Sequence, residues 1–146
     1  MFGDEGRDFL LGSSEDDEIS GGDDADVMVG GGGADLFVYD TRFASLADKK
    51  GRWSPEMGDT IVDFEAEDRD KIDLTQLATY GANAPKKLAW SRSGAAEYSV
   101  WIIPRDGDTV VVMDLDGDAL ADSAFRLLGD LRLTALDFCG VASDSG

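Results

Sequence analysis

Large apolar residues recur at every ninth position in the first part of the chain, at Leu10, Ile19, Met28 and Phe37. Each is the middle of a three-residue segment that follows six residues rich in glycine and acidic residues. A six-residue turn followed by three extended residues predicts a very short strand whose middle side chain points inward. The pattern therefore predicts a coil of alternating turns and strands over residues 3–38.

The turns and strands are contiguous copies of one nine-residue unit, which reads GDEGRDFLL, GSSEDDEIS, GGDDADVMV and GGGGADLFV. A glycine opens each copy, and an aspartate (Asp8, Asp17, Asp26 and Asp35) holds its sixth place. This is the calcium-binding nonapeptide pattern G-G-x-G-x-D-x-U-x. Ca²⁺ takes six to eight oxygen ligands, which two stacked turns can supply and one cannot. We therefore expect the turn of residues 3–8 to stack on residues 21–26, and residues 12–17 to stack on residues 30–35.

The apolar pattern changes after the repeats. Ile61, Phe64, Ile72 and Leu74 indicate two short strands, and residues 75–80 indicate one helical turn. Residues 86–91, 98–103, 109–115 and 125–128 read as antiparallel strands separated by turns such as Asp106-Gly107. Residues 133–138 predict a closing helical turn. The expected core of this part consists of Trp90, Val100, Trp101, Ile102, Val110, Val112 and Leu127.

These elements predict one all-β module over residues 1–146. A right-handed parallel β-roll of nonapeptide repeats (residues 3–38) leads through a loop (39–58) into a mostly antiparallel, sandwich-like β cap (59–138). A polar tail (139–146) follows. The strands of the roll are too short to be stable alone, because ordering a residue costs about 1–2 kcal/mol of backbone entropy.

The charge is strongly negative, with 31 acidic and 13 basic residues and a net charge of −18. Such a surface attracts divalent cations and repels nucleic acid and anionic membranes, so we expect neither as a partner. No apolar run approaches the 18 residues that a membrane span needs, and no signal peptide opens the sequence. The single cysteine, Cys139, rules out an internal disulfide, and we expect it to be buried.

Two segments leave alternatives open. Residues 114–118, DLDGD, lack the glycine and glutamate spacing of an EF-hand, so they form either a minor calcium site or an aspartate-rich turn. The basic stretch after the repeats, residues 41–58, is either a surface loop or part of a binding surface for an acidic polysaccharide. The candidate polysaccharide-binding residues are Arg42, Lys49, Lys50, Arg52, Trp53, Lys86, Lys87 and Arg92.

Catalysis is not expected in this chain. It contains no histidine, which excludes an HExxH zinc helix and a histidine-based triad. Cys139 has no histidine to activate it as a nucleophile. The acidic residues have the spacing of metal ligands rather than that of a glycosidase carboxylate pair.

The repeats followed by ADLFVYD, DTIVDF…DKIDL and VVMDLDGDALAD…LTALDF resemble the C-terminal RTX module of serralysin-type secreted metalloproteases. They resemble equally the R-modules of mannuronan C5-epimerases. The resemblance spans residues 3–138. It implies a calcium-loaded β-roll, about three to five Ca²⁺ ions, and export from a bacterium by a type I secretion machinery through an uncleaved C-terminal signal.

The resemblance also implies the ligands. One site would use Gly3, Glu5 and Asp8 with Gly22, Asp24 and Asp26; a second would use Gly12, Ser14 and Asp17 with Gly31, Gly33 and Asp35; a third would use Gly30 and Gly32 with Asp63 and Asp70. Asp68 is a rival to Asp70. The second site departs from the pattern, because Ser13 and Glu15 replace glycine and Glu is disfavoured in the left-handed region.

The sequence therefore predicts a non-catalytic calcium-binding module that folds outside the cell and supports the secretion and stability of an attached enzyme. The alternative is an alginate- or exopolysaccharide-binding module. The two functions are compatible.

Overall fold

The computed structural model describes residues 2–3, 6–22, 25–39, 59–78, 87–92, 94, 96–115, 117–119 and 122–142. The nonapeptides form four short strands, β1 (Phe9–Leu11), β2 (Glu18–Ile19), β3 (Val27–Val29) and β4 (Leu36–Val38). β1 pairs in parallel with β3, and β2 pairs in parallel with β4. Successive strands thus alternate between two sheets, so the first turn stacks on the third and the second on the fourth, as predicted.

The rest of the chain continues with short strands and few helical residues. The elements are β5 (Thr60–Ile61), the 3-10 helix η1 (Ala66–Asp68), β6 (Lys71–Asp73), α1 (Thr75–Ala78), β7 (Leu88–Trp90), β8 (Ser99–Arg105), β9 (Asp108–Met113), β10 (Ser123–Leu127), the 3-10 helix η2 (Ala135–Asp137), β11 (Phe138–Cys139) and β12 (Val141–Ala142). No helix of the described part has the length and apolar character to cross a bilayer.

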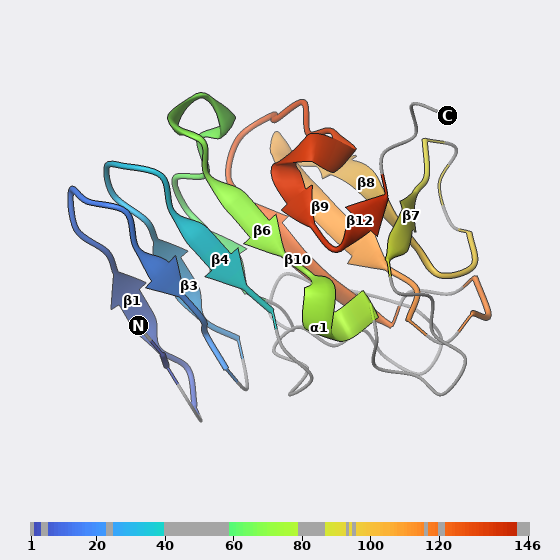
Figure 1. The fold of residues 1–146 in the computed structure, drawn as a ribbon, viewed down its shortest axis with the longest axis horizontal. Helices are drawn as coiled ribbons and strands as arrows, with labels where there is room; N and C mark the ends of the chain where they lie inside the picture. Colours follow the sequence, from blue (N-terminus) through green and yellow to red (C-terminus); the bar gives the residue numbers. More distant parts are fainter. Residues whose placement is uncertain are drawn as a thin grey trace.

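The roll and the cap share one sheet. Its order is β1-β3-β5-β10-β9-β8-β7-β12, and a second sheet has the order β11-β6-β4-β2. β10 pairs in parallel with β5 of the roll and antiparallel with β9 of the cap. Figure 1 shows the roll on the left and the cap on the right. The predicted all-β fold, a parallel roll that continues into a mostly antiparallel cap, is confirmed.

The core of the roll lies between its two sheets. The middle residues of the nonapeptide strands face inward, and Ile19 and Phe37 are fully buried. Ile61 of β5 and Ile72 of β6 repeat this position and are also fully buried. The same core continues into the cap through Phe125 and other residues, so the roll and the cap bury one apolar interior.

The predicted core of the cap is divided between the two faces of its sheet. Val100 and Leu127 belong to the main core, and Trp90 and Ile102 are partly buried against it. Trp101, Val110 and Val112 instead form a separate buried cluster with Ala124. Successive side chains of a strand point to opposite faces, so neighbours such as Val100 and Trp101 must enter different clusters.

Two local predictions are wrong. The segment around β7 does not join the antiparallel strands, because β7 pairs in parallel with both β8 and β12. The chain between β7 and β8 returns to the start of the neighbouring strand instead of reversing in a tight hairpin. Cys139 is exposed, since its neighbour Phe138 points into the core and consecutive strand residues face opposite ways.

Two phenylalanines test the inward and outward positions of the roll. Phe37 is fully buried and Phe9 is 66% exposed. Phe37→Ala should lower the free energy of unfolding in saturating calcium by about 3–5 kcal/mol, because it opens a cavity in the core. Phe9→Ala should change it by less than about 1 kcal/mol. Urea unfolding followed by circular dichroism measures both, and equal losses would contradict the inward assignment.

Candidate metal centre

The sixth-position aspartates form two columns, one along each sheet of the roll. Each aspartate immediately precedes a strand, so the parallel pairing of the strands brings the aspartates of stacked turns together. In the eight-stranded sheet, the backbone N–H of Asp8 donates to Asp26 Oδ1 at 2.7 Å, and that of Asp26 donates to Asp59 Oδ1 at 2.9 Å. We call Asp8, Asp26 and Asp59 the first column.

The second column runs along the other sheet and contains Asp17, Asp35 and Asp70. The N–H of Asp17 donates to Asp35 Oδ1 at 3.0 Å, and that of Asp35 donates to Asp70 Oδ1 at 2.9 Å. In both columns, one carboxylate oxygen of each acceptor is therefore fixed by the backbone of the preceding turn. This fixes the direction in which the other oxygen, Oδ2, points.

The Oδ2 oxygens of Asp8 and Asp35 are buried and accept no hydrogen bond. A buried, ionised carboxylate oxygen without a donor is costly, and a cation is the usual partner. Hard carboxylate and carbonyl oxygens on stacked turns are the ligands that Ca²⁺ prefers. The donor set of these residues therefore fits Ca²⁺.

Glycine is required where the turns approach these oxygens. A Cβ added to Gly21 or Gly30 would collide with Oδ2 of Asp26 or Asp35, and one added to Gly12 or Gly31 would collide with a carbonyl oxygen of the stacked turn. Gly31 and Gly33 also have φ of +88° and +82°, a region that other residues seldom adopt.

The second turn differs from the others, at the positions where Ser13 and Glu15 replace glycine. Ser13 donates to Asp17 Oδ2 through its backbone N–H at 2.6 Å and through its hydroxyl at 3.1 Å. Asp17 Oδ2 is thus already occupied by hydrogen bonds, unlike Oδ2 of Asp8 and Asp35. Because Ser13 replaces glycine, Asp17 of the second turn is less available to an ion.

Asp63 and Asp70 lie beside the fourth turn, as the resemblance implied. Asp63 accepts hydrogen bonds from the N–H groups of Gly30 and Gly31, both at 2.8 Å. Asp70 accepts through Oδ2 from the N–H of Glu65 at 3.0 Å, in addition to the bond from Asp35. Both carboxylates are therefore engaged by backbone donors. Asp68, the rival, is exposed in η1 and lies outside the columns.

Asp59 is a member of the first column that sequence reasoning did not select. The signal was present, because Asp59-Thr60-Ile61 and Asp70-Lys71-Ile72 repeat the D-x-U spacing of the nonapeptides. The glycine-rich part of the nonapeptide is missing before Asp59 and before Asp70. For this reason the sequence did not show that the roll continues there. The roll therefore extends by one strand in each sheet beyond the last nonapeptide.

The structure shows the turn in which each remaining predicted ligand lies, where that residue is described. Gly3, Gly22 and Gly32 lie in their expected turns, and the N–H of Gly32 donates to the Ser13 carbonyl at 3.0 Å. The exposed Ser14 lies next to Gly32 in the stacked turn. Glu5 and Asp24 lie outside the described residues.

Burial, together with negative charge at the columns, raises the pKa of several groups. Burial raises the pKa of Asp35 to about 6; the N–H of Asp17 opposes this shift, and the charge of Asp70 adds to it. Burial also raises the pKa of Asp70, against the hydrogen bonds that it accepts. Tyr39 has a raised pKa because it is buried and because the charges of Asp59 and Asp26 lie near it. The carboxylates therefore repel one another, and a divalent cation would remove this repulsion.

The aspartate-rich segment after β9 contains a compact acidic cluster. Ligand oxygens of Asp114, Asp118 and Asp122 lie within 4.8 Å of one another. Fully buried Asp114 accepts hydrogen bonds from the N–H groups of Tyr98, Gly117 and Ala119. The backbone donors around Asp114 are those of an aspartate-rich turn, and the three clustered carboxylates have the spacing of metal ligands, so both alternatives that the sequence left open stay predictions.

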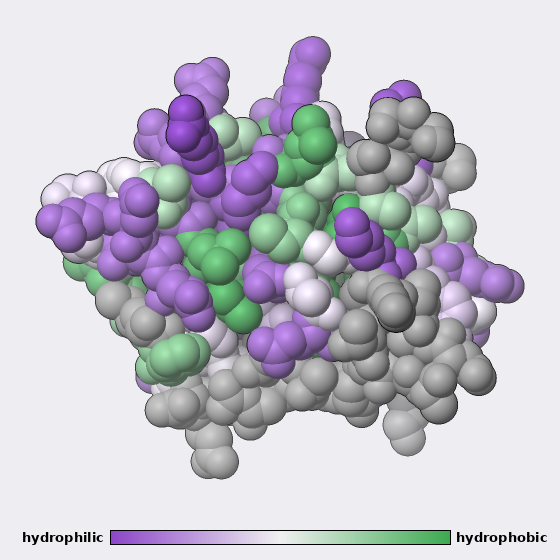
Figure 2. All heavy atoms as spheres, viewed as in Figure 1, coloured by the Kyte–Doolittle hydropathy of each residue, from purple (hydrophilic) through white to green (hydrophobic). Residues whose placement is uncertain are grey.

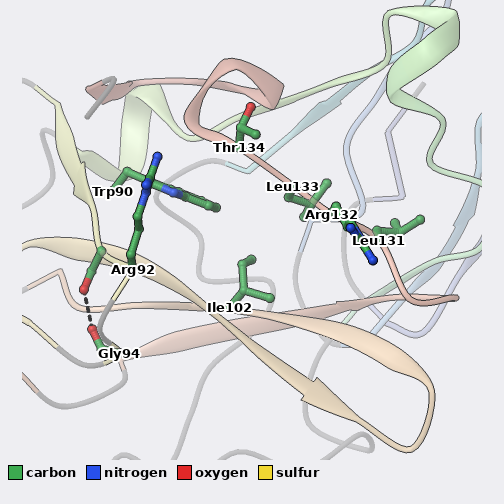
Figure 3. Close-up of a pocket in the computed structure, with 9 residues that line it drawn as sticks. Trp90, Arg92, Gly94, Ile102, Leu131, Arg132, Leu133 and Thr134 are labelled. Carbon is green, nitrogen blue, oxygen red and sulfur yellow. Dashed lines mark hydrogen bonds between the residues drawn. The ribbon is translucent and has the colours of Figure 1, made fainter. Parts of the chain in front are cut away.

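Of the predicted polysaccharide-binding residues, Lys87 and Arg92 are described, and both are exposed. Arg42, Lys49, Lys50, Arg52, Trp53 and Lys86 lie outside the described residues. Arg92 lines a hollow of about 410 Å³ together with Trp90, Ile102, Arg132 and other residues (Figure 3). Hydrophilic side chains gather over the half of the molecule that contains the roll (Figure 2).

Comparisons with known proteins agree with this geometry. Residues 2–37 match the family model of the RTX calcium-binding nonapeptide repeat in four copies. A comparison with curated proteins gives no significant match.

Two solution structures share the fold, both subunits of the Azotobacter vinelandii mannuronan C5-epimerase. The AlgE6R3 subunit has a TM-score of 0.61 and 23% identity, over 95% of this chain and 81% of that one. The AlgE6R2 subunit has a TM-score of 0.59 and 18% identity, over 100% of this chain and 93% of that one. Residues 2–37 are therefore RTX calcium-binding nonapeptide repeats, and the chain as a whole has the fold of an R-module.

Proposed function

We propose that this chain is a non-catalytic module that folds when its turns bind several Ca²⁺ ions, and that it supports the secretion and stability of an attached enzyme outside the cell. The observation that carries the proposal is the pair of aspartate columns, in which Asp8 Oδ2 and Asp35 Oδ2 are buried without a hydrogen-bond donor. We expect about three to five ions.

The columns make folding without a cation unfavourable. Carboxylates on adjacent strands lie about 4.8 Å apart, which corresponds to repulsion on the order of 3 kcal/mol per pair at an effective dielectric constant of about 20. The strands are too short to offset the repulsion of several carboxylate pairs. Each strand buries one large apolar side chain, which contributes about 1.5–3 kcal/mol. Calcium would replace repulsion by coordination at each pair of stacked turns.

Calcium concentration then determines where the chain folds. At about 1 mM Ca²⁺ and a site Kd of about 0.1 mM, each ion stabilises the folded state by about 1.4 kcal/mol. Four such sites contribute about 5–6 kcal/mol, which is comparable with the whole stability of a small domain. In a cytosol with sub-micromolar calcium, the chain would stay unfolded and fit for a narrow export channel, and folding outside would hinder its return.

A second candidate function, binding of an acidic polysaccharide, is favoured by the hollow in Figure 3. Its lining combines the indole of Trp90 with the guanidinium-bearing Arg92 and Arg132. An aromatic ring can pack against a sugar ring, and arginine binds carboxylates through paired hydrogen bonds. Both structural relatives belong to a mannuronan C5-epimerase, an enzyme named for an acidic polysaccharide.

The calcium dependence can be measured with a matched pair of variants. Asp35→Asn keeps the Oδ1 acceptor for the N–H of Asp17 but removes the charge, so the calcium midpoint of folding should rise about tenfold. Asp130→Asn removes an equally charged but exposed side chain and should leave the midpoint unchanged. Circular dichroism at buffered free calcium gives both midpoints. A chain that is fully folded in EGTA would contradict the proposal.

Acid should partly replace calcium. The pKa of Asp35 is raised from 3.8 to about 6 in the folded chain, so the folded state binds a proton more tightly than the unfolded state does. In EGTA, the contribution of Asp35 is therefore most favourable below about pH 4 and is lost as the pH rises through about 6. Lowering the pH from 7.5 to 4.5 should restore β structure, and Asp35→Asn should weaken this dependence. A circular dichroism signal in EGTA that does not change with pH would contradict the role of Asp35 in this dependence.

The polysaccharide candidate has its own test. Titration of the calcium-loaded chain with oligomannuronate should shift the amide and indole NMR signals of Trp90, Arg92 and Arg132. Arg132→Ala should weaken binding about tenfold or more, in line with the loss of a charged hydrogen bond. Arg105→Ala, at the exposed end of β8, serves as the control. Unchanged signals at the hollow would remove this function without affecting the calcium proposal.

A further inference from the structure

The two sheets of the roll present different outer faces. The middle residue of each short strand points into the core, so the residues on either side of it point outward. On the four-stranded sheet, the outward residues include the charged Glu18, Lys71 and Asp73. On the eight-stranded sheet, β1 and β3 direct only apolar side chains outward, namely Phe9, Leu11, Val27 and Val29. The outer face of the eight-stranded sheet is therefore apolar along the roll.

This apolar surface continues from the roll into the cap. The register aligns Phe9 of β1 with Val27 of β3, and Val27 with Thr60 of β5. Thr60 is aligned in turn with Arg126 of β10. Directly opposed residues of neighbouring strands point to the same face, so these residues form one row across the sheet. Leu128 lies two residues after Arg126 and takes the next outward position.

The apolar side chains of this surface are in contact with solvent. Phe9 and Leu11 are 66% and 60% exposed, Leu128 is 37% exposed, and Val27 and Val29 are half-buried. We call these five residues the apolar face. Contiguous apolar surface that remains exposed in a folded chain marks sites where proteins associate. The apolar face is therefore a candidate contact surface.

The charge on this side of the molecule differs from that of the whole chain. The chain has a net charge of −18, but β1, β3, β5 and β10 contain no acidic residue. The charged residue in the row is Arg126. Its Nη2 lies 3.4 Å from Thr60 Oγ1, and its Nε is buried and forms no hydrogen bond. The apolar face thus lacks carboxylates and has beside it a guanidinium that can donate to a carboxylate.

We propose that two copies of this chain associate through their apolar faces, with the two eight-stranded sheets packed against each other about a two-fold axis. A two-fold contact joins one patch to itself, and an apolar patch is complementary to itself. Because the face contains no acid, two strongly acidic chains meet there without opposing carboxylates. Arg126 beside the face offers a cation to the acidic turns of the second copy. A basic partner protein fits less well, because the acidic turns would attract it more than the acid-free face.

The dimer goes beyond the proposed function, but its calcium dependence rests on that function. β1 and β3 form the apolar face only when the roll is folded, and under the proposed function calcium folds the roll. Four Ca²⁺ ions would also reduce the net charge from −18 to about −10, which weakens the repulsion between two copies. Association should therefore accompany calcium binding.

Sedimentation equilibrium of the calcium-loaded chain tests the contact. The chain should be largely dimeric at about 100 µM, because interfaces of ordinary size reach at least micromolar affinity. Phe9→Lys and Val27→Lys should each weaken dimerisation about tenfold or more, because they place a charge inside the contact. Leu36→Lys is the matched control: it adds the same charge at the same position of a nonapeptide, but on the other sheet, and should leave the Kd unchanged. Circular dichroism in calcium shows whether each variant is folded.

The dependence on salt separates apolar association from association through charge. Raising the NaCl concentration from 0.1 M to 1 M shortens the Debye length from about 10 Å to about 3 Å. Because the two copies carry charge of the same sign, dimerisation through the apolar face should become tighter. A dimer that dissociates as salt is added, while the chain remains folded, would contradict the proposal.

Two further outcomes would overturn the dimer. One is a folded, calcium-loaded chain that stays monomeric at about 1 mM, a concentration well above the Kd of ordinary interfaces. The other is a dimer that Phe9→Lys and Val27→Lys leave intact, or that Leu36→Lys weakens equally. A chain that is folded and dimeric in EGTA, with the same response to Phe9→Lys, would support the contact while contradicting calcium-dependent folding.

Discussion

Buried carboxylates that face one another across stacked turns are the constraint on which this structure depends. In Asp26 and Asp35, the N–H of the preceding turn fixes one carboxylate oxygen, so the other oxygen has a defined direction. Oδ2 of Asp8 and Oδ2 of Asp35 are buried and have no hydrogen-bond donor. The one large apolar residue that each short strand buries cannot offset such an array of charge alone. Under the proposed function, a cation with several oxygen ligands would be part of the fold rather than an addition to it.

The junction between the roll and the cap extends this dependence beyond the repeats. Asp59 and Asp70 complete the columns, yet the strands that follow them, β5 and β6, belong to the segment after the nonapeptides. β5 then pairs with β10 of the cap. Ordering the metal-binding turns and ordering the cap are coupled, because both sheets run through this junction and share one core.

The candidate site could be predicted in outline but not in detail. The period of the repeats identified the aspartates and the pairing of the turns, since a parallel roll of this period stacks every second turn. Asp59 was missed because its turn lacks the glycines, although its D-x-U spacing matches the repeats. The bonds from Ser13 to Asp17 Oδ2 could not be predicted, because they depend on the conformation that the second turn adopts without glycine.

The sequence by itself determined the nine-residue period, the inward position of one large side chain per strand, the all-β class and the preference for calcium. These properties follow from local spacing and from the chemistry of glycine and aspartate. Only the tertiary structure decided that β7 pairs in parallel, that the cap core divides between two faces of one sheet and that Cys139 points outward. Such features depend on which distant strands become neighbours, and short strands of similar apolar content do not encode that choice locally.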